Sequence, residues 1–312
     1  MSLKIAIQMD DIDSINIESD STFILALEAQ KRGYKIFYYM PWQLSLYKNQ
    51  VIANATEITL YDNKDAYYKL GENIILDLQD VDVVLMRQDP PFDMNYITYT
   101  YLLERISDKT LVINNPAEVR NSPEKIFATL FHDLMPPTLI SRDTAIMQEF
   151  YNEHKDIIIK PLHAFGGQDI HRIGENSDNF QELAKNLCDK YNEPIMLQSF
   201  LPQVIEGDKR IILIDGEFAG AILRVPKSGD IRSNLACGGT AVKTQLTAKE
   251  AEICDILSPK LRRKGLMLTG IDVIGGYLTE INVTSPTGIR AINKLNETCL
   301  EAIFWDKVES KL

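Results

Sequence analysis

The stretch 270–283 constrains the fold most, because it reads as two short strands joined by paired glycines. Its sequence is GIDVIGGYLTEINV, and paired glycines between apolar runs indicate a β-hairpin. Aliphatic residues alternate there with Asp272, Glu280 and Asn282. Because strand side chains point alternately to opposite faces, we expect one face in the core and these three side chains on the other. Two carboxylates and an amide suit a hard cation such as Mg²⁺, which also binds substrate phosphates.

The length of the turn decides whether the two carboxylates share a face. A two-residue turn would pair Asp272 with Thr279 and place Asp272 on the face away from Glu280. A three-residue connection over 275–277 pairs Asp272 with Glu280 and puts Asn282 on the same side. We therefore predict an odd-length turn, with a glycine in the left-handed region forming a bulge. The alternative is an ordinary hairpin whose polar face meets water.

The bulk composition is that of a globular protein. The chain has 312 residues, with 45% hydrophobic and 25% charged residues, which is enough for two or three layered domains. It contains no apolar run of about 18 residues, and no signal sequence precedes the first strand-like stretch. We therefore expect a cytoplasmic protein without a membrane partner.

The charge and the cysteines narrow the classes further. The formal net charge of −11 argues against a general nucleic-acid partner, which would need a basic stripe. An anionic substrate must therefore be bound by local lysines and arginines. The four cysteines lie far apart in the sequence, and in the cytosol we expect them to be reduced.

The N-terminal third alternates strands and helices, which is typical of a parallel sheet with helices on its faces. In such sheets ligands bind beyond the carboxyl ends of the strands, so the loop 10–16, Arg87 and Asp89 are candidates for holding a substrate. Arg87 could bind a carboxylate with two nitrogens; alternatively, it is a surface residue paired with Asp89. The expected strands are 3–9, 34–40, 82–86 and 111–113, and the expected helices are 21–32 and 96–106.

Two lysines and a pair of glycines follow. Ser122 reads as a helix N-cap and Pro123 as the first helical residue. Lys125 then falls in the first turn, where the helix dipole disfavours a cation unless an anion is bound. Lys160 ends the next expected strand, and the glycines of 166–167 come soon after it. Such glycines can form an anion-binding nest, although a plain turn is the alternative.

The later strands carry arginines. Arg210 enters a hairpin with an Asp-Gly turn at 215–216, and Arg210 and Arg224 lie near strand ends, where they could reach a polyphosphate. The loop 226–239 has no periodicity and is hinged by glycines, which is typical of a lid or of a disordered segment. As a lid it would bring Arg232 into the site on closing. Further expected elements are helix 180–191, strand 195–198, helix 249–264 and a C-terminal helix ending near 308.

The order of these features resembles that of the ATP-grasp superfamily. More narrowly, MRQDPPFD at 86–93 and TEINVTSPT at 279–287 resemble the prokaryotic glutathione synthetases, and the resemblance covers nearly the whole chain. It implies an α/β protein, α+β in its ATP-binding part, with an ATP-grasp fold after a Rossmann-like N-terminal domain. The implied parts are an N-terminal substrate domain over 1–121, a small ATP-binding lid subdomain over 122–200 and a catalytic subdomain over 201–312.

The resemblance also implies the chemistry. Enzymes of this family join γ-glutamylcysteine to glycine with ATP, so these are the implied small-molecule partners, and a homo-oligomer, specifically a tetramer, is implied. The residues implied to bind ATP are Lys125, Lys160, Gly166, Gly167, Gln198, Ser199, Phe200, Leu201 and Asp208, with 198–201 at the adenine and Asp208 at the ribose. Two Mg²⁺ ions, alternatively Mn²⁺, are implied at Asp272, Glu280 and Asn282.

The residue types suit an acyl-phosphate reaction. A carboxylate must be activated by phosphoryl transfer before an amine attacks it, and the tetrahedral oxyanion then needs fixed cationic donors. We assign Arg210 and, from the lid, Arg232 to this role, with Arg224 as a further catalytic candidate. The residues predicted to bind substrate are Arg87, Asp89, Ser285, Thr287 and Arg290.

Two departures from the family pattern and two alternatives remain. The glycine loop is poor in glycine, with His163-Ala164-Phe165 before Gly166, which bears on the ATP affinity, and Gly288 suggests a roomier substrate pocket.

One alternative is another ATP-grasp ligase, of the peptide-tail or D-alanine type, with the same catalytic parts. The other is a non-catalytic ATP-binding scaffold, against which the metal residues and the arginine-bearing loop argue.

Overall fold

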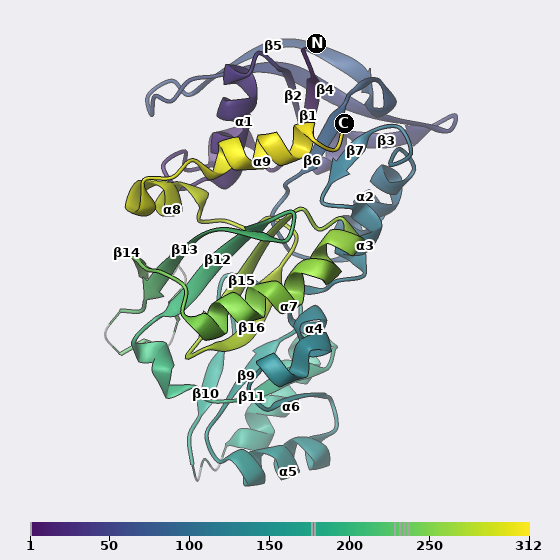
Figure 1. The fold of residues 1–312 in the computed structure, drawn as a ribbon. Coiled ribbons are helices and arrows are strands. Elements are labelled where there is room, and N and C mark those ends of the chain that lie inside the picture. Colours follow the sequence, from purple (N-terminus) through teal and green to yellow (C-terminus); the bar gives the residue numbers. More distant parts are fainter. Residues whose placement is uncertain are drawn as a thin grey trace.

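The computed structural model describes residues 2–175, 177, 179–227, 229–230, 232–233, 235 and 238–312. Within these ranges the chain forms three β-sheets, numbered here in chain order (Figure 1). In space, the third sheet lies between the first and the second. Both chain ends lie beside the first sheet. The first part is α/β and the other two are α+β, as the sequence predicts.

The first sheet has seven strands, and four of them, β2, β1, β6 and β7, are parallel as predicted. An antiparallel meander, β3 to β5, extends the sheet beyond β2 in a segment where we predicted no strands. The bounds are β1 Lys4–Gln8, β2 Lys35–Tyr39, β3 Leu44–Tyr47, β4 Gln50–Leu60, β5 Tyr68–Asp77, β6 Val83–Met86 and β7 Leu111–Ile113.

Helices α1 (Ser21–Lys31) and α2 (Met94–Glu104) follow β1 and β6. The Asp20 carboxylate caps α1 by accepting a hydrogen bond from Phe23 N at 2.6 Å, and Gly33, at a φ of 80°, follows its end. These local signals explain why the expected and observed bounds of α1 nearly coincide.

Two short helices, α3 (Pro116–Arg120) and α4 (Glu124–Ala128), lead into the second part. Our prediction that Ser122 caps the second helix and that Pro123 is its first residue was wrong. Pro123 is itself the N-cap residue, and Ser122 Oγ is buried without a hydrogen-bond partner among the described residues. The cause is the preceding helix, because α3 runs to Arg120 and leaves Ser122 in the connection between the two helices.

The second sheet is antiparallel, in the order β10, β9, β11, β8, and its apolar face packs on two helices. Its strands are β8 Thr138–Ser141, β9 Ile157–Pro161, β10 His171–Ile173 and β11 Ile195–Ser199, and its helices are α5 Thr144–His154 and α6 Phe180–Tyr191. The observed α6 has the predicted bounds, and β11 extends one residue further than predicted.

The third sheet is also antiparallel, in the order β14, β13, β12, β15, β16, and α7 packs against it (Figure 1). The predicted Asp-Gly turn joins β12 to β13, with positive φ values at Asp215 and Gly216. The capping box of Thr247 and Glu250 begins α7. The bounds are β12 Asp208–Ile214, β13 Glu217–Val225, β14 Thr240–Lys243, β15 Leu268–Ile274, β16 Tyr277–Asn282 and α7 Ala248–Lys264.

The hairpin of β15 and β16 has the predicted pairing but not the predicted turn. Asp272 lies opposite Glu280, while Ile274 pairs with Tyr277, so the turn has only two residues, both glycines with positive φ. The extra residue is Thr279, at an irregularity in the register between Asp272 and Val273. The bulge thus lies within the strand, where the Thr279 hydroxyl donates to Asp272 O at 3.1 Å.

The C-terminal segment forms two helices instead of the single one predicted, α8 (Ile289–Asn296) and α9 (Leu300–Glu309). Glu297 takes a left-handed conformation, which ends α8. Helix α9 returns to the first sheet, where it packs on α1 and Trp305 Nε1 donates to Leu25 O at 2.8 Å. Residues of α1 and α9 therefore share one hydrophobic core.

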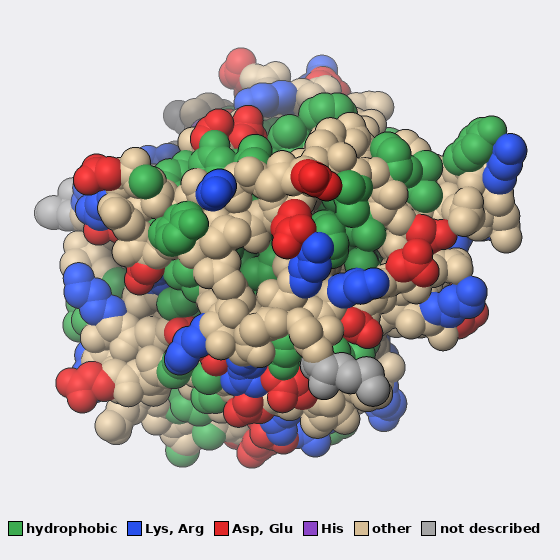
Figure 2. Space-filling model, turned by 90° about the horizontal axis from the view of Figure 1, so that it is seen from above, with side chains coloured by type: hydrophobic (Ala, Val, Ile, Leu, Met, Phe, Trp, Pro, Cys, Tyr) green, Lys and Arg blue, Asp and Glu red, His purple; other side chains and the backbone are tan. Residues whose placement is uncertain are grey.

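The surface at the end formed by the first sheet is mixed. Acidic and basic side chains are interspersed there, with hydrophobic side chains between them (Figure 2). Trp42 and Ile75, each 67% exposed, are among the exposed large hydrophobic residues of this sheet and its connections. Among the described helices, none is both long enough and apolar enough to cross a membrane.

Candidate active site

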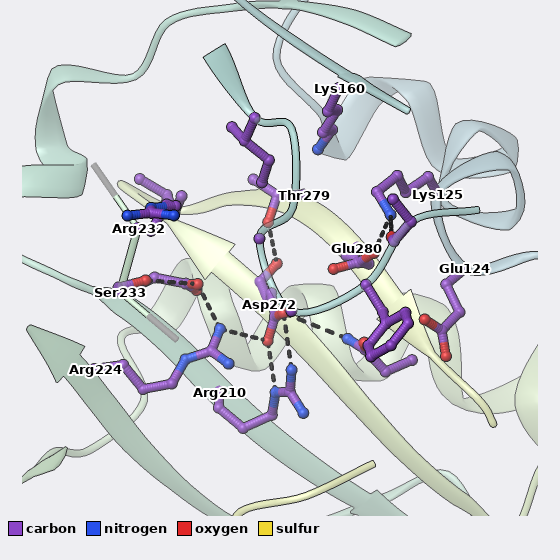
Figure 3. A pocket seen from close by; sticks show the side chains of 18 of the residues that line it. Glu124, Lys125, Lys160, Arg210, Arg224, Arg232, Ser233, Asp272, Thr279 and Glu280 are labelled. Atoms are coloured by element: carbon purple, nitrogen blue, oxygen red, sulfur yellow. Dashed lines mark hydrogen bonds and ion pairs between the residues drawn. The ribbon is translucent and has the colours of Figure 1, made fainter. Parts of the chain in front are cut away.

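A cavity of about 320 Å³ lies between the second and third sheets and is closed on one side by α4 (Figure 3). Its volume is in the range of small-molecule sites. The predicted site residues that line it are Asp89, Lys125, Lys160, Gly166, Gly167, Gln198, Ser199, Phe200, Leu201, Asp208, Arg210, Arg224, Arg232, Asp272, Glu280, Asn282, Ser285 and Thr287. Arg87 and Arg290 are not among the lining residues.

The polar face of the β15–β16 hairpin forms the floor of this cavity. Asp272 and Glu280 are directly opposite each other, and all three predicted metal-binding side chains line the cavity. Asn282 Nδ2 donates to Gly270 O at 3.2 Å, which orients the amide. The hairpin thus brings two carboxylates and an amide together on one face.

Two arginines hold Asp272 from the neighbouring strands. Arg210 donates from Nε and Nη2 to the two carboxylate oxygens at 2.6 and 3.0 Å, and Arg224 Nη2 lies 2.9 Å from Oδ1 (Figure 3). Arg224 also bonds Asp208. Burial by itself would raise the pKa of Asp272, but Arg210 and Arg224 outweigh it and hold that pKa below its usual range. Burial raises the pKa of Asp208 to about 6, although Arg224 opposes this shift.

The two predicted lysines are both buried at the cavity. Lys125 Nζ lies 3.1 Å from Glu280 Oε1 and donates to Ala164 O at 2.7 Å, so it bridges the β15–β16 hairpin and the loop 162–170 that carries Gly166 and Gly167, called the glycine loop. Lys160, at the end of β9, points into the cavity (Figure 3). Burial lowers the pKa of Lys160 to about 8, while the nearby Glu280 opposes the shift. A bound anion would stabilise the charged form of Lys160, which burial disfavours.

The glycine loop and the end of β11 lie across the cavity from the hairpin. Gly166 and Gly167 have φ values of 65° and 81°, so both adopt a conformation that favours glycine. At the end of β11, the Gln198 side chain donates to Thr138 Oγ1 at 2.9 Å, and the Phe200 ring stacks under the Arg172 guanidinium at 3.7 Å. An aromatic ring in this place suits a flat, apolar ligand group.

The predicted lid over 226–239 falls partly outside the described residues, which exclude 228, 231, 234, 236 and 237. In its described part, Arg232 and Ser233 line the cavity. Arg232 donates to Asp230 at 2.9 and 3.1 Å, and Ser233 Oγ donates to Asp208 at 3.1 Å. Arg232 therefore already faces the site that we predicted it would enter.

Arg87 and Arg290 do not line the cavity. Both contact residues of the N-terminal part of the chain instead. Arg87 is buried and donates to Thr22 Oγ1 and Pro286 O, each at 3.0 Å. Burial lowers the pKa of Arg87. Arg290 pairs with Asp62 at 2.9 Å. The alternative interpretation, a surface Arg87 paired with Asp89, was wrong because Arg87 is buried at the end of β6. The substrate roles of Arg87, Asp89 and Arg290 stay predictions.

Glu124 is a cavity residue that our sequence reasoning missed. It is half-buried at the start of α4, and its carboxylate accepts hydrogen bonds from residues 283 and 284. Burial raises the pKa of Glu124, and the Glu280 carboxylate raises it further. An acidic residue in the first turn of a helix is common, so nothing in the local sequence distinguishes Glu124 from an ordinary helix start.

The donor set fits Mg²⁺ held together with a nucleotide. No group of three His, Cys, Asp or Glu side chains in the described part of the chain is arranged to hold a metal ion unaided. Mg²⁺ is commonly bound by one or two carboxylates together with substrate phosphates, and Asp272, Glu280 and Asn282 provide oxygen ligands only. The lysines beside them would hold those phosphates.

Comparisons with known proteins identify relatives over the whole chain. The model of the prokaryotic glutathione synthetase N-terminal domain matches residues 3–120, and that of the ATP-grasp domain matches 124–297. A glutathione synthetase of Rhodopseudomonas palustris is 53% identical over 100% of this chain and 99% of its own. One of Escherichia coli is 40% identical over 99% of each chain.

Solved structures share the fold at low sequence identity. A D-cycloserine synthetase superposes with a TM-score of 0.68 at 15% identity, covering 98% of this chain and 99% of its own. An ATP-grasp ligase solved with a precursor variant, Mg and ADP gives a TM-score of 0.62 at 16% identity, covering 99% and 98%. The family models and the full-length relatives together show that this chain belongs to the prokaryotic glutathione synthetase family, whose members are ATP-dependent ligases of the ATP-grasp fold.

Proposed function

We propose that this chain joins the cysteinyl carboxylate of γ-glutamylcysteine to the amine of glycine, with conversion of ATP to ADP and phosphate, in the cavity described above. One observation carries the proposal: Asp272, Glu280 and Asn282 share one face of the hairpin, within a cavity that also holds two buried lysines. Family membership narrows the ligation to these substrates.

In the first step, a carboxylate oxygen of γ-glutamylcysteine attacks the γ-phosphorus of ATP, and the bond to the ADP oxygen breaks. Lys125 and Lys160 bind the phosphates and neutralise their charge, and Gly166 and Gly167 cover them. Two Mg²⁺ ions, alternatively Mn²⁺, would be held by Asp272, Glu280 and Asn282, where they supply further positive charge to the phosphates. The adenine lies at 198–201 and the ribose at Asp208.

In the second step, the amine of glycine attacks the acyl carbon and loses a proton to the departing phosphate, which leaves with the oxygen that was the carboxylate's. The tetrahedral oxyanion is stabilised by Arg210 and Arg232, which both line the cavity (Figure 3). Arg224 holds Arg210's partner Asp272 and completes this cationic group. The described part of the lid shields the acyl phosphate from water.

The substrate residues lie where the first and third sheets meet. Asp89, Ser285 and Thr287 line the cavity at this end, and Ser285 Oγ donates to Arg87 O at 3.2 Å. Arg87 and Arg290 do not line the cavity, but both remain candidates for binding a carboxylate of the substrate.

An amine-acceptor screen tests the proposal. Purified protein is incubated with MgATP, γ-glutamylcysteine and one amine at a time, and ADP release is measured together with the mass of the product. We expect ADP release above background with glycine and a product of the mass of glutathione. ADP release with D-alanine or a peptide tail, but not with glycine, would assign another ligase activity. No release with any amine would favour a non-catalytic scaffold.

The cellular setting follows from the substrates. ATP and a reduced thiol substrate are available in the cytoplasm, where we propose that the protein acts. We also propose a homo-oligomer, specifically a tetramer, which light scattering on the purified protein would test.

A further inference from the structure

The two residues that follow the β15–β16 hairpin are hydrogen-bonded to one carboxylate oxygen, that of Glu124. Glu124 Oε1 accepts hydrogen bonds from Val283 N at 3.1 Å, from Thr284 N at 3.3 Å and from Thr284 Oγ1 at 2.8 Å. These two residues directly follow Asn282, the last residue of β16. One side chain of α4 therefore fixes the point at which β16 ends and the loop 284–288 begins.

The carbonyl group of Val283 is also held by a side chain. Asn114 Nδ2 donates to Val283 O at 2.7 Å and to Leu268 O at 2.8 Å, and Asn114 Oδ1 accepts from Leu268 N at 2.9 Å. Both backbone groups of Val283 are thus satisfied by side chains, from Glu124 on one side and Asn114 on the other. Among the strands that the structure describes, none pairs with Val283, since β16 ends at Asn282.

The residue after Glu124, Lys125, contacts the hairpin itself at the carboxylate of Glu280. Lys125 Nζ lies 3.1 Å from Glu280 Oε1 and also bonds the glycine loop at Ala164 O (Figure 3). Two consecutive residues of α4 therefore reach Glu280 and the two residues that directly follow Asn282. A shift of α4 relative to β16 would move both positions together.

We propose that Glu124 is a positioning residue: it holds Asn282 and the loop 284–288 at a fixed distance from Lys125, and so from the metal-bound nucleotide. Glu124 acts through the backbone of 283–284. The inference rests on the proposed function of the cavity, because it assumes that Asn282 binds metal there. Residues that orient metal ligands from outside the ligand shell commonly change metal affinity by about 10–100-fold when replaced.

The conservative variant distinguishes positioning from charge. Glu124→Gln keeps a side-chain oxygen that accepts from the same three donors, so positioning is retained. Glu124→Ala removes that oxygen and leaves two buried backbone N–H groups without their acceptor. Glu118→Ala is a matched control, because Glu118 pairs with Lys264 outside the cavity and also joins an early helix to the third part of the chain.

The experiment measures Mn²⁺ binding by electron paramagnetic resonance in the presence of ADP, without turnover, on proteins whose melting temperatures are recorded. We expect the Mn²⁺ dissociation constant to rise about tenfold in Glu124→Ala and to equal the wild-type constant, within experimental error, in Glu124→Gln and Glu118→Ala. An unchanged constant in the alanine variant, or a glutamine variant as weak as the alanine variant, would overturn the proposal.

A second variant covers the case in which Glu124→Ala does not fold. Thr284→Val removes only the hydroxyl donor at 2.8 Å, and we expect it to weaken Mn²⁺ binding by roughly threefold. An unchanged constant for this variant would also count against Glu124 positioning. A wild type that binds Mn²⁺ and ADP but releases no glutathione would refute the proposed function alone, and the variant comparison would still decide the role of Glu124.

Discussion

Arg210 donates to both carboxylate oxygens of Asp272, at 2.6 and 3.0 Å, inside the cavity. The residue proposed to stabilise the oxyanion is therefore bonded to the residue proposed to bind metal. A Mg²⁺ ion must share this carboxylate with Arg210 or replace it there, and replacement would leave the guanidinium facing the acyl group. The pair couples metal binding to the placement of the catalytic cation.

Replacing Asp272 by Asn should lower the turnover number by about a hundredfold or more, because one charge on the metal and the partner of two buried arginines are lost together. Glycine-dependent ADP release at limiting Mg²⁺ measures the effect. Asp306→Asn is a control, since Asp306 pairs with Arg32 far from the cavity and its side chain is 71% exposed. Near-wild-type activity of Asp272→Asn at limiting Mg²⁺ would refute the metal role.

The hairpin could be predicted because its signals are local. Alternation with a period of two predicted which side chains of each strand share a face, and the expected odd-length connection paired Asp272 with Glu280. The observed pairing of these two residues confirms that prediction. The turn prediction was wrong because the bulge is at Thr279, whose hydroxyl bonds the opposite strand. A period-two pattern reports which residues share a face but not where an extra residue is inserted.

The contacts between distant segments could not be predicted. Glu124 and Val283 are 159 positions apart, and their hydrogen bond depends on how α4 packs against β16. Arg87 was correctly expected at a strand end, but its burial against Pro286 depends on the same packing between parts of the chain. A single sequence gives the faces of strands and the ends of helices, whereas these contacts arise only when the three sheets assemble.

Nucleotide affinity should depend on pH through Lys160. Burial lowers the pKa of Lys160 to about 8, so in the free protein this lysine loses its proton as the pH rises through that value. Bound phosphate favours the charged form, so the affinity should be highest below the pKa and fall by up to about tenfold per pH unit above it. Calorimetric titration with ADP across this range measures the slope.

The matched variant is Lys160→Arg, whose guanidinium stays charged because its pKa is above about 12. Its affinity for ADP should be flat over the same range. Equal slopes in the two proteins would show that another group controls the pH dependence.

Replacing Arg232 by Ala should lower kcat by about 10²-fold while the apparent ATP affinity changes little, because the proposed role is stabilisation of the oxyanion. Steady-state kinetics with ATP varied at saturating γ-glutamylcysteine and glycine gives both values. Lys227→Ala, in the same loop but outside the cavity wall, provides a control. A raised KM for ATP with an unchanged kcat would indicate that Arg232 binds ground-state nucleotide instead.

Replacing Asn114 by Ala should destabilise the fold, because three buried backbone groups at Leu268 and Val283 lose their partners. We expect a loss of about 3 kcal/mol, visible as a melting temperature lower by several degrees. Asn73→Ala, at an exposed position of β5, should leave the melting temperature nearly unchanged. Equal melting temperatures for the two variants would mean that the loop after β7 does not hold the hairpin.

The acyl-phosphate mechanism can be tested by following an oxygen atom from the substrate carboxylate. γ-Glutamylcysteine labelled with ¹⁸O in its cysteinyl carboxylate is turned over with MgATP and glycine, and the released phosphate is analysed by mass spectrometry. The account predicts one ¹⁸O atom in each phosphate, because the attacking carboxylate oxygen leaves with the phosphoryl group. Glutathione formed with unlabelled phosphate would contradict an acyl-phosphate reaction in this cavity.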